Sequence, residues 1–226
     1  MEEKKAQVVE KGANIEDVIS KSELYIEEHK NTILIVVIVV VVAILAFFGM
    51  RKFYFQPRQV KANEAVYAAE QWYQQSDFQQ ALEGNEQYDG FIDVAKRFGS
   101  TKAGKRAKYC AGICYLQLGQ YEEAASYLKS YKGKDIFTPI LATIAEGDAQ
   151  LDMGNTHAAL GLYEKAAKMD DNYITAPFSL FKAGMVNVIE GNGKKALECF
   201  TSIKKKYPES TEWRDIDKYI AWAESM

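Results

Sequence analysis

Residues Ala111–Ala124 read AGICYLQLGQYEEA, and the small residues in this stretch are regularly spaced. A glycine is followed seven positions later by a second glycine, and five positions after that by an alanine. This G-x6-G-x4-A spacing occurs three times, with offsets of 35 and 37 residues. The copies consist of Gly112, Gly119 and Ala124; Gly147, Gly154 and Ala159; and Gly184, Gly191 and Ala196. Three matching columns at a period of about 34 residues indicate an array of repeated helix pairs.

Each column has a physical reason in a helix–turn–helix unit. The first glycine has no Cβ and lets the second helix approach closely, and the alanine in that second helix is small for the same reason. The second glycine permits the left-handed backbone that often ends a helix. A large side chain stands four residues after each alanine, at Leu128, Tyr163 and Phe200, and is expected to fill the space between helices.

These columns resemble the tetratricopeptide repeat. The resemblance implies an all-α fold in which helix pairs stack into a solenoid of three to four repeats, closed by a C-terminal capping helix. The three clear repeats are expected at about 105–138, 140–173 and 177–210.

Flanking segments extend the array on both sides. Residues 62–98 resemble a degenerate earlier repeat in which Gly84 and Gly90 interrupt the second helix. The stretches STKAGKRAKY and STEWRDIDKY both begin with a Ser-Thr pair that can cap a helix, and both reach Lys-Tyr at the same offset. We therefore expect 211–225 to form a lone helix that caps the array, because solenoids need capped ends. The repeat domain then covers 62–226.

An uninterrupted apolar run precedes the array. Ile33–Phe48 contains only Ile, Leu, Val, Phe and Ala. At about 1.5 Å per residue, a helix of about 18 residues spans about 27 Å, close to the hydrocarbon thickness of a bilayer. We predict a single transmembrane helix at 32–50 in the lipid bilayer, followed by a juxtamembrane linker at 51–61. A cleaved signal peptide fits poorly, because the run is long and no small-residue cleavage site follows it.

The N-terminal segment, 1–31, has its own apolar pattern. Four of its apolar side chains would share one face of a helix: Ile15, Val18, Ile19 and Ile26. This segment is either an amphipathic helix on a membrane or partner, or a solvated extension of the transmembrane helix. Charge does not fix the orientation, since three lysines precede the apolar run and four Lys or Arg residues follow it within about 20 residues.

Composition excludes several classes of function. The net charge of −3 gives no basic excess for nucleic acid, so no nucleic-acid partner is expected. The sequence has two histidines and no phosphate-binding or nucleophile motif, so we predict a protein that is not an enzyme and has no cofactor. Cys110 and Cys114 stand four residues apart, either as a metal or redox pair or as two small buried residues in a helix interface.

The resemblance also implies where partners bind. In this family the first helices of the repeats line a concave surface, and the corresponding positions here are mostly apolar. An exposed apolar surface usually marks a binding site. The expected partner groove contains Tyr109, Ile113, Leu116, Asp148, Phe178, Phe181, Met185 and Val188. Two alternatives remain, in which the groove is filled by the closing helix or by a second copy of the chain in a homodimer.

The whole layout resembles one bacterial group. A short N-terminal segment, one apolar helix and degenerate tetratricopeptide repeats are similar to the YfgM-type ancillary subunits of the SecYEG translocon. The resemblance implies a single-pass protein of the bacterial inner membrane with a periplasmic C-terminal domain. Its partners would be the translocon, a periplasmic chaperone or an emerging polypeptide.

Two other functions fit the same layout. The stretches YDGFIDVAKRFGSTKAGKRA and CFTSIKKKYPESTEW are similar to repeat domains of envelope-assembly and cell-division coordinators, which would grip one folded partner. A cytosol-facing receptor has the same N-anchored order, and the small Lys/Arg excess after the apolar run favours it.

Overall fold

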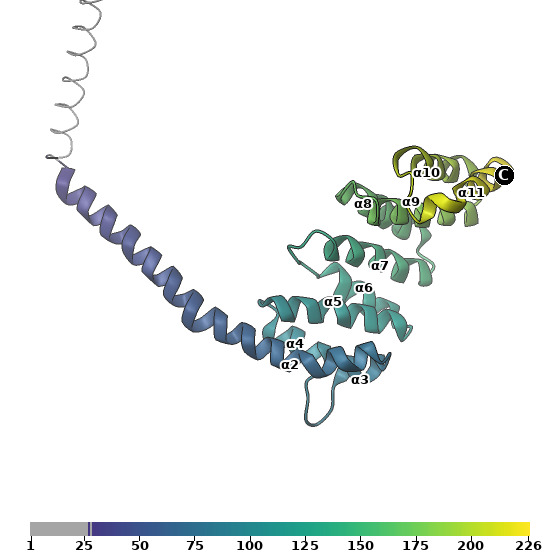
Figure 1. Ribbon diagram of the computed structural model, residues 1–226. Coiled ribbons are helices and arrows are strands. Elements are labelled where there is room, and N and C mark those ends of the chain that lie inside the picture. Colours follow the sequence, from purple (N-terminus) through teal and green to yellow (C-terminus); the bar gives the residue numbers. More distant parts are fainter. Residues whose placement is uncertain (1–26, 28) are drawn as a thin grey trace, which may run out of the picture. The chain divides into compact units, whose positions relative to one another are not determined.

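The computed structural model describes Glu27 and residues 29–226, and its described part is helical with one isolated bridge between Gly84 and Asp89 (Figure 1). The chain divides into two units, Met1–Pro57 and Arg58–Met226. The amphipathic pattern at Ile15, Val18, Ile19 and Ile26 lies outside the described residues.

One helix among the described residues, His29–Gln74, is long and apolar enough to cross a membrane. Its apolar side chains are exposed over the predicted span, with Leu34 at 58% and Leu45 at 65%. The assignment rests on the length and the apolar composition of this helix.

Residues 51–61, which we expected to link the membrane helix to the repeats, are helical. They comprise the π-helical turn η1 (Arg51–Phe55) and the start of α2 (Gln56–Gln74). The segment contains no glycine, and its one proline, Pro57, lies two residues after the π-turn ends. A π-turn is a common way for a helix to accommodate a local break in its hydrogen-bond ladder. The helix therefore continues through the predicted linker.

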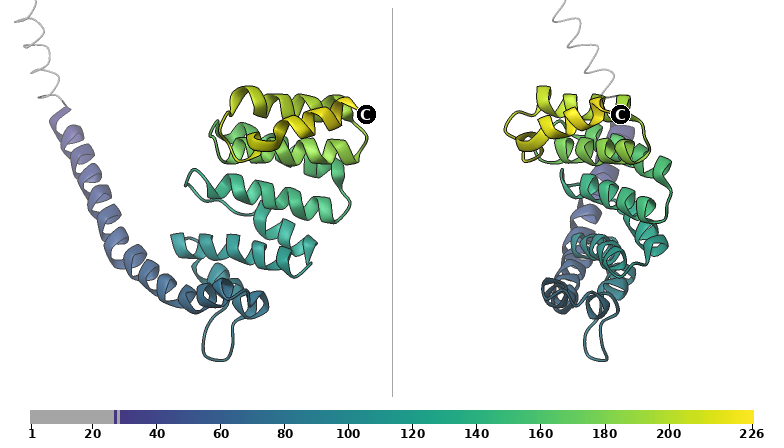
Figure 2. Two further views of the ribbon diagram at one scale, coloured as in Figure 1. Left: turned by 45° about the vertical axis from the view of Figure 1, so that its right-hand side comes forward. Right: turned by 90° about the vertical axis from the view of Figure 1, so that its right-hand side faces the viewer.

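The second unit is a stack of antiparallel helix pairs, shown from two sides in Figure 2. Each helix packs against the next one in the chain, and the first helices of successive pairs also touch. The pairs are α5 (Lys102–Gln117) with α6 (Tyr121–Lys129), α7 (Thr138–Asp152) with α8 (Thr156–Met169), and α9 (Thr175–Ile189) with α10 (Gly193–Lys206). This arrangement confirms the predicted all-α repeat solenoid.

The two helices of each pair lie close together at the first glycine. A Cβ added at Gly112 would lie 2.7 Å from Cγ of Leu128 on the paired helix. A Cβ added at Gly147 would lie 2.6 Å from Cε1 of Tyr163, and a Cβ added at Gly184 would lie 2.4 Å from Cε1 of Phe200. In each copy the partner is the large residue four positions after the alanine.

The second glycine ends the first helix of each pair. Gly119, Gly154 and Gly191 have φ values of 74°, 80° and 74°. In the first copy the N–H of Gly119 donates to the carbonyl of Leu116, and the next N–H donates to the carbonyl of Tyr115. The other two copies repeat this pair of bonds. This is the Schellman ending of an α-helix, which needs a left-handed residue at this position.

The first unit of the solenoid departs from this plan. Its second helix is divided into α3 (Phe78–Glu83) and α4 (Phe91–Phe98). The loop between them closes where Gly84, with φ of 78°, approaches Gly90. An added Cβ on either glycine would lie 2.4 Å from the backbone nitrogen of the other.

The far end of the array is closed by a short 3-10 turn, η2 (Glu212–Asp215), and by α11 (Ile216–Glu224). We expected one helix over 211–225. At the equivalent helix start, the Thr101 hydroxyl accepts from the N–H of Gly104 and α5 begins directly. Ser210 accepts from the N–H of Trp213, and the turn it caps is 3-10, so the α-helix begins only at Ile216. Such turns are frequent at helix N-termini.

Candidate functional site

The clearest hollow on the predicted concave positions lies along α9. Four α9 side chains line this hollow from one face of the helix, at positions 178, 182, 185 and 189. The hollow has a volume of about 270 Å³. Its lining, which we name the α9 groove, consists of Leu151, Tyr163, Phe178, Phe181, Lys182, Met185, Val186 and Ile189. Six of these eight side chains are aliphatic, aromatic hydrocarbon or thioether groups.

Two of the lining residues are open to solvent. Ile189 is 69% exposed and Phe178 is 37% exposed, so both can contact a ligand without rearrangement. Exposed apolar groups gathered around one hollow are unusual on a surface that faces only water. The groove therefore has the features of a binding surface for an apolar side chain.

One polar network forms part of the groove. The Tyr163 hydroxyl donates to Oδ1 of Asp148 at 2.6 Å, and Lys182 Nζ lies 2.9 Å from the same oxygen. Lys182 also lies over the rings of Tyr163 and Phe178, 5.7 and 5.2 Å from their centroids. Burial, together with the hydrogen bond to Asp148, raises the pKa of Tyr163 well above its ordinary value. The network fixes the position of the Lys182 ammonium at the groove.

The closing helix covers one side of the groove. The ring of Phe181 lies edge-on to Tyr219 of α11, with 4.7 Å between centroids, and both rings contact Phe200. Filling by the closing helix is thus partial, because Phe178 and Ile189 stay exposed.

The structure distributes the eight predicted groove residues over different surroundings. Phe178, Phe181 and Met185 line the α9 groove together, and Asp148 adjoins it through its ion pair with Lys182. The three predicted positions on α5 are Tyr109, Ile113 and Leu116. They pack against a separate core cluster that includes Ala142, Ala145 and Ala149 of α7.

Val188 does not line the groove. It is only 5% exposed and packs in a core cluster with Ala196, Phe200 and Ile203. Val188 stands one helical turn after Gly184, whose face meets Phe200, so it points at α10 rather than outward.

Five residues that line the groove are not among the eight predicted ones: Leu151, Tyr163, Lys182, Val186 and Ile189. The spacing of Phe178, Lys182, Met185 and Ile189 on one helical face was a signal for Lys182. Tyr163 was predicted only to fill the space between helices, and no sequence pattern indicated that its hydroxyl reaches Asp148.

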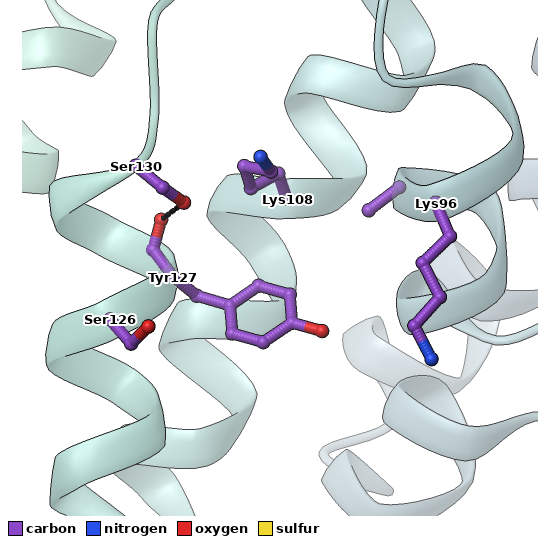
Figure 3. Close-up of a pocket in the computed structure, with 6 residues that line it drawn as sticks. Lys96, Lys108, Ser126, Tyr127 and Ser130 are labelled. Carbon is purple, nitrogen blue, oxygen red and sulfur yellow. Dashed lines mark hydrogen bonds between the residues drawn. The ribbon is translucent and has the colours of Figure 1, made fainter.

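A second, smaller hollow lies between α4, α5 and α6 (Figure 3). Its volume is about 200 Å³. Figure 3 shows the lysine and hydroxyl side chains around it, with the Ser130 hydroxyl bonded to the carbonyl of Tyr127. The lining residues are Ala95, Lys96, Lys108, Ser126, Tyr127 and Ser130. This composition suits a small anion rather than an apolar group.

The cysteines are free thiols, and two of them lie within the first core cluster or against it. Burial raises the pKa of Cys110 and of Cys114 to about 12. A thiol with such a pKa stays protonated and unreactive at neutral pH. Within the described residues, no group of His, Cys, Asp and Glu is placed to hold a metal ion. The packing interpretation of this pair therefore agrees with their surroundings.

Comparison with known protein families matches residues 107–135 to the tetratricopeptide repeat. The chain contains a tetratricopeptide repeat. The match covers most of the α5–α6 pair, which contains the first of the three copies of the G-x6-G-x4-A pattern. No curated protein sequence matches the chain. Tetratricopeptide repeats generally mediate protein–protein contacts and are non-enzymatic, so the repeat indicates an interaction scaffold.

Proposed function

We propose that this protein is a membrane-anchored scaffold that holds an apolar segment of an unfolded or emerging polypeptide in the α9 groove. The observation that supports it is the apolar hollow of about 270 Å³, with Phe178 and Ile189 exposed beside it. A peptide in extended conformation can place a single aliphatic or aromatic side chain in a hollow of this size. The apolar helix within His29–Gln74 would keep the scaffold at the membrane.

The setting that we propose is the periplasmic face of the bacterial inner membrane, beside the Sec translocon. This part of the proposal is supported by the resemblance to YfgM-type subunits. There the groove would receive emerging chains or pass them to a periplasmic chaperone. Protease treatment of spheroplasts tests the orientation with an epitope tag after Met226. Loss of the tag while a cytoplasmic control survives is the expected result.

A cytosol-facing receptor is the second candidate, favoured by the four Lys or Arg residues after the apolar run against three before it. Protection of the tag until the inner membrane is broken would replace the periplasmic assignment with this one. The proposed groove chemistry is the same in both settings.

Binding of a defined unfolded chain tests the groove itself. The full-length protein in nanodiscs is titrated with a reduced, carboxymethylated protein that cannot refold, and separately with the same protein in its native form. We expect saturable binding of the unfolded form alone. A coordinator that grips one folded partner would not bind the unfolded chain, and that result would favour the envelope-coordinator function.

Two substitutions target the exposed groove residues without touching the Phe181–Tyr219 contact. Phe178→Ser combined with Ile189→Ser should weaken the dissociation constant for the unfolded chain by about tenfold, because apolar contact area is lost. Tyr67→Ser on α2 is the matched control, since Tyr67 is 65% exposed and lies outside the groove. Equal affinities for both variants would place the binding surface elsewhere.

A further inference from the structure

The turns of the solenoid divide the formal charge of the domain between two opposite edges. The first helices of successive pairs stack and run in the same direction (Figure 1). The loops that join one pair to the next therefore all lie at one edge of the domain. We name this the basic edge; its segments are 96–105, 129–138, 165–175 and 204–214. They contain thirteen Lys or Arg residues and five Asp or Glu residues.

The other edge has the opposite charge. It is formed where the first helix of each pair ends and the second begins, in segments 74–86, 116–124, 150–158 and 189–196. These segments contain two lysines and seven Asp or Glu residues. Residues 51–226 as a whole are neutral, with 23 charges of each sign. The polarity therefore comes from the placement of charges and not from any excess.

Compensation of helix dipoles explains only part of the basic edge. Last-turn lysines such as Lys129 and Lys168 would stabilise the C-terminal ends of α6 and α8. Lys132 and Lys134 have no such role, because they lie in the loop between α6 and α7 and are exposed. The acid in the same loop, Asp135, accepts hydrogen bonds from the N–H of Thr138 and the hydroxyl of Tyr131. The two lysines of this loop are therefore exposed, whereas its carboxylate accepts hydrogen bonds from neighbouring residues.

Large apolar side chains protrude from the same edge. Ile136 and Phe137 at the end of the α6–α7 loop are 66% and 46% exposed. Tyr173 and Ile174 in the α8–α9 loop are 57% and 67% exposed. Lys132 and Lys134 precede the exposed pair of the α6–α7 loop, whereas Asp170 and Asp171 precede that of the α8–α9 loop. Exposed aliphatic and aromatic groups beside lysines, as in the α6–α7 loop, are the combination that binds the interface of an anionic bilayer, where apolar groups enter the headgroup region and lysines meet phosphates.

We propose that the basic edge docks on the surface of an anionic lipid bilayer. The candidate membrane helix in the same chain supplies the second argument, because a tethered domain meets the bilayer at a high effective concentration. The hollow of Figure 3 adjoins this edge through Lys96 and Ser130, and its two lysines suit a lipid phosphate. Docking on lipid is a separate activity from capture of an apolar segment in the α9 groove.

The test measures how close each edge comes to lipid. The full-length protein is reconstituted in nanodiscs of phosphatidylcholine, with or without phosphatidylglycerol. An environment-sensitive fluorophore is attached at Ile136→Cys on the basic edge or at Ile189→Cys on the opposite edge, and spin-labelled lipids serve as quenchers. The two positions are matched in exposure, at 66% and 69%.

We expect quenching at position 136 to exceed that at 189 by about twofold or more in the anionic discs, and to fall at high salt as the charges are screened. Lys132→Glu with Lys134→Glu should reduce quenching at 136 to the level at 189, while circular dichroism stays unchanged. Equal quenching at both positions would overturn the proposal, and so would quenching at 136 that does not depend on anionic lipid. A response to soluble heparin without any response to the discs would assign the edge to another polyanion and overturn the lipid assignment.

Discussion

The three regular repeats and the first unit of the array use glycine in different ways. In the repeats, Gly112, Gly147 and Gly184 each make room for a side chain on the paired helix. In the first unit, Gly84 and Gly90 make room for each other's backbone. A side chain can shift to accept a new methyl group, whereas a backbone crossing cannot. The regular repeats should therefore tolerate small changes at their glycines better than the first unit does.

The largest effect is expected at the backbone crossing. In Gly90→Ala the new Cβ would lie 2.4 Å from the Gly84 nitrogen and from the Leu82 carbonyl oxygen. We expect the variant to lose about 3 kcal/mol or more of unfolding free energy, or to release α3 and α4 from the domain. Urea denaturation measures the first outcome and hydrogen exchange of 78–98 the second. Wild-type behaviour in both would show that the loop has another low-energy path, and the comparison would fail.

An intermediate effect is expected at the ring contact of the third repeat. In Gly184→Ala the Cβ would meet Cε1 of Phe200, which is fully buried and held by Phe181 and Tyr219. Overpacking of this kind costs about 1–3 kcal/mol.

A double-mutant cycle sharpens this prediction. Phe200→Leu removes the clashing ring edge, so the double variant should be more stable than the sum of the two single effects implies. Additive effects would mean that the two residues do not compete for the same space.

A smaller effect is expected at the turn glycines, where backbone conformation and not space is limiting. Gly154 has φ of 80° and no atom within 4 Å of a new Cβ. Gly154→Ala should cost about 1 kcal/mol because alanine disfavours the left-handed region. Gly161 in α8 is the matched control, since its Cβ would also meet nothing within 4 Å and its backbone is helical. Gly161→Ala should raise stability by up to about 1 kcal/mol. Melting curves that shift in the same direction for both would contradict this explanation.

The smallest effect at neutral pH concerns buried thiols and phenols. Burial raises the pKa of Tyr109, Cys110, Cys114 and Tyr207 to about 12 in the folded state. The unfolded chain releases these protons near pH 8.5 for Cys and 10 for Tyr. Stability should therefore be constant near pH 7, fall from about pH 9, and continue to fall up to pH 12. Denaturation midpoints at several pH values measure this, with Cys110→Ala and Cys114→Ala expected to make the fall near pH 9 smaller. A midpoint that does not change up to pH 11 would be inconsistent with buried, protonated groups.

Much of the fold could be predicted because the constraints are local. A glycine column at a fixed spacing, followed by a large residue four after the alanine, specifies which helices touch and where. The apolar run Ile33–Phe48 likewise needed no tertiary information. The interruption between α3 and α4 was also visible from Gly84 and Gly90.

The remainder depended on contacts between distant residues. Val188 was assigned to the groove by its position in the repeat, but it shares a helix face with Gly184 and is buried against α10. The helical continuity of 51–61 depended on a π-turn ahead of Pro57, which no simple pattern predicts. The charge polarity of the two edges became visible only when the turns were grouped in space.

The measurement that tests the central claim most directly is cross-linking of a defined unfolded chain to the groove. A photoreactive amino acid is placed at Ile189 or at Tyr67, two exposed positions of similar openness, at 69% and 65%. The full-length protein in nanodiscs is mixed with the reduced, carboxymethylated probe protein and irradiated. We predict adducts from position 189, their loss when unlabelled unfolded chain competes, and no adducts from position 67. Equal adducts from both positions, or none from 189, would contradict the assignment of the α9 groove as the binding surface.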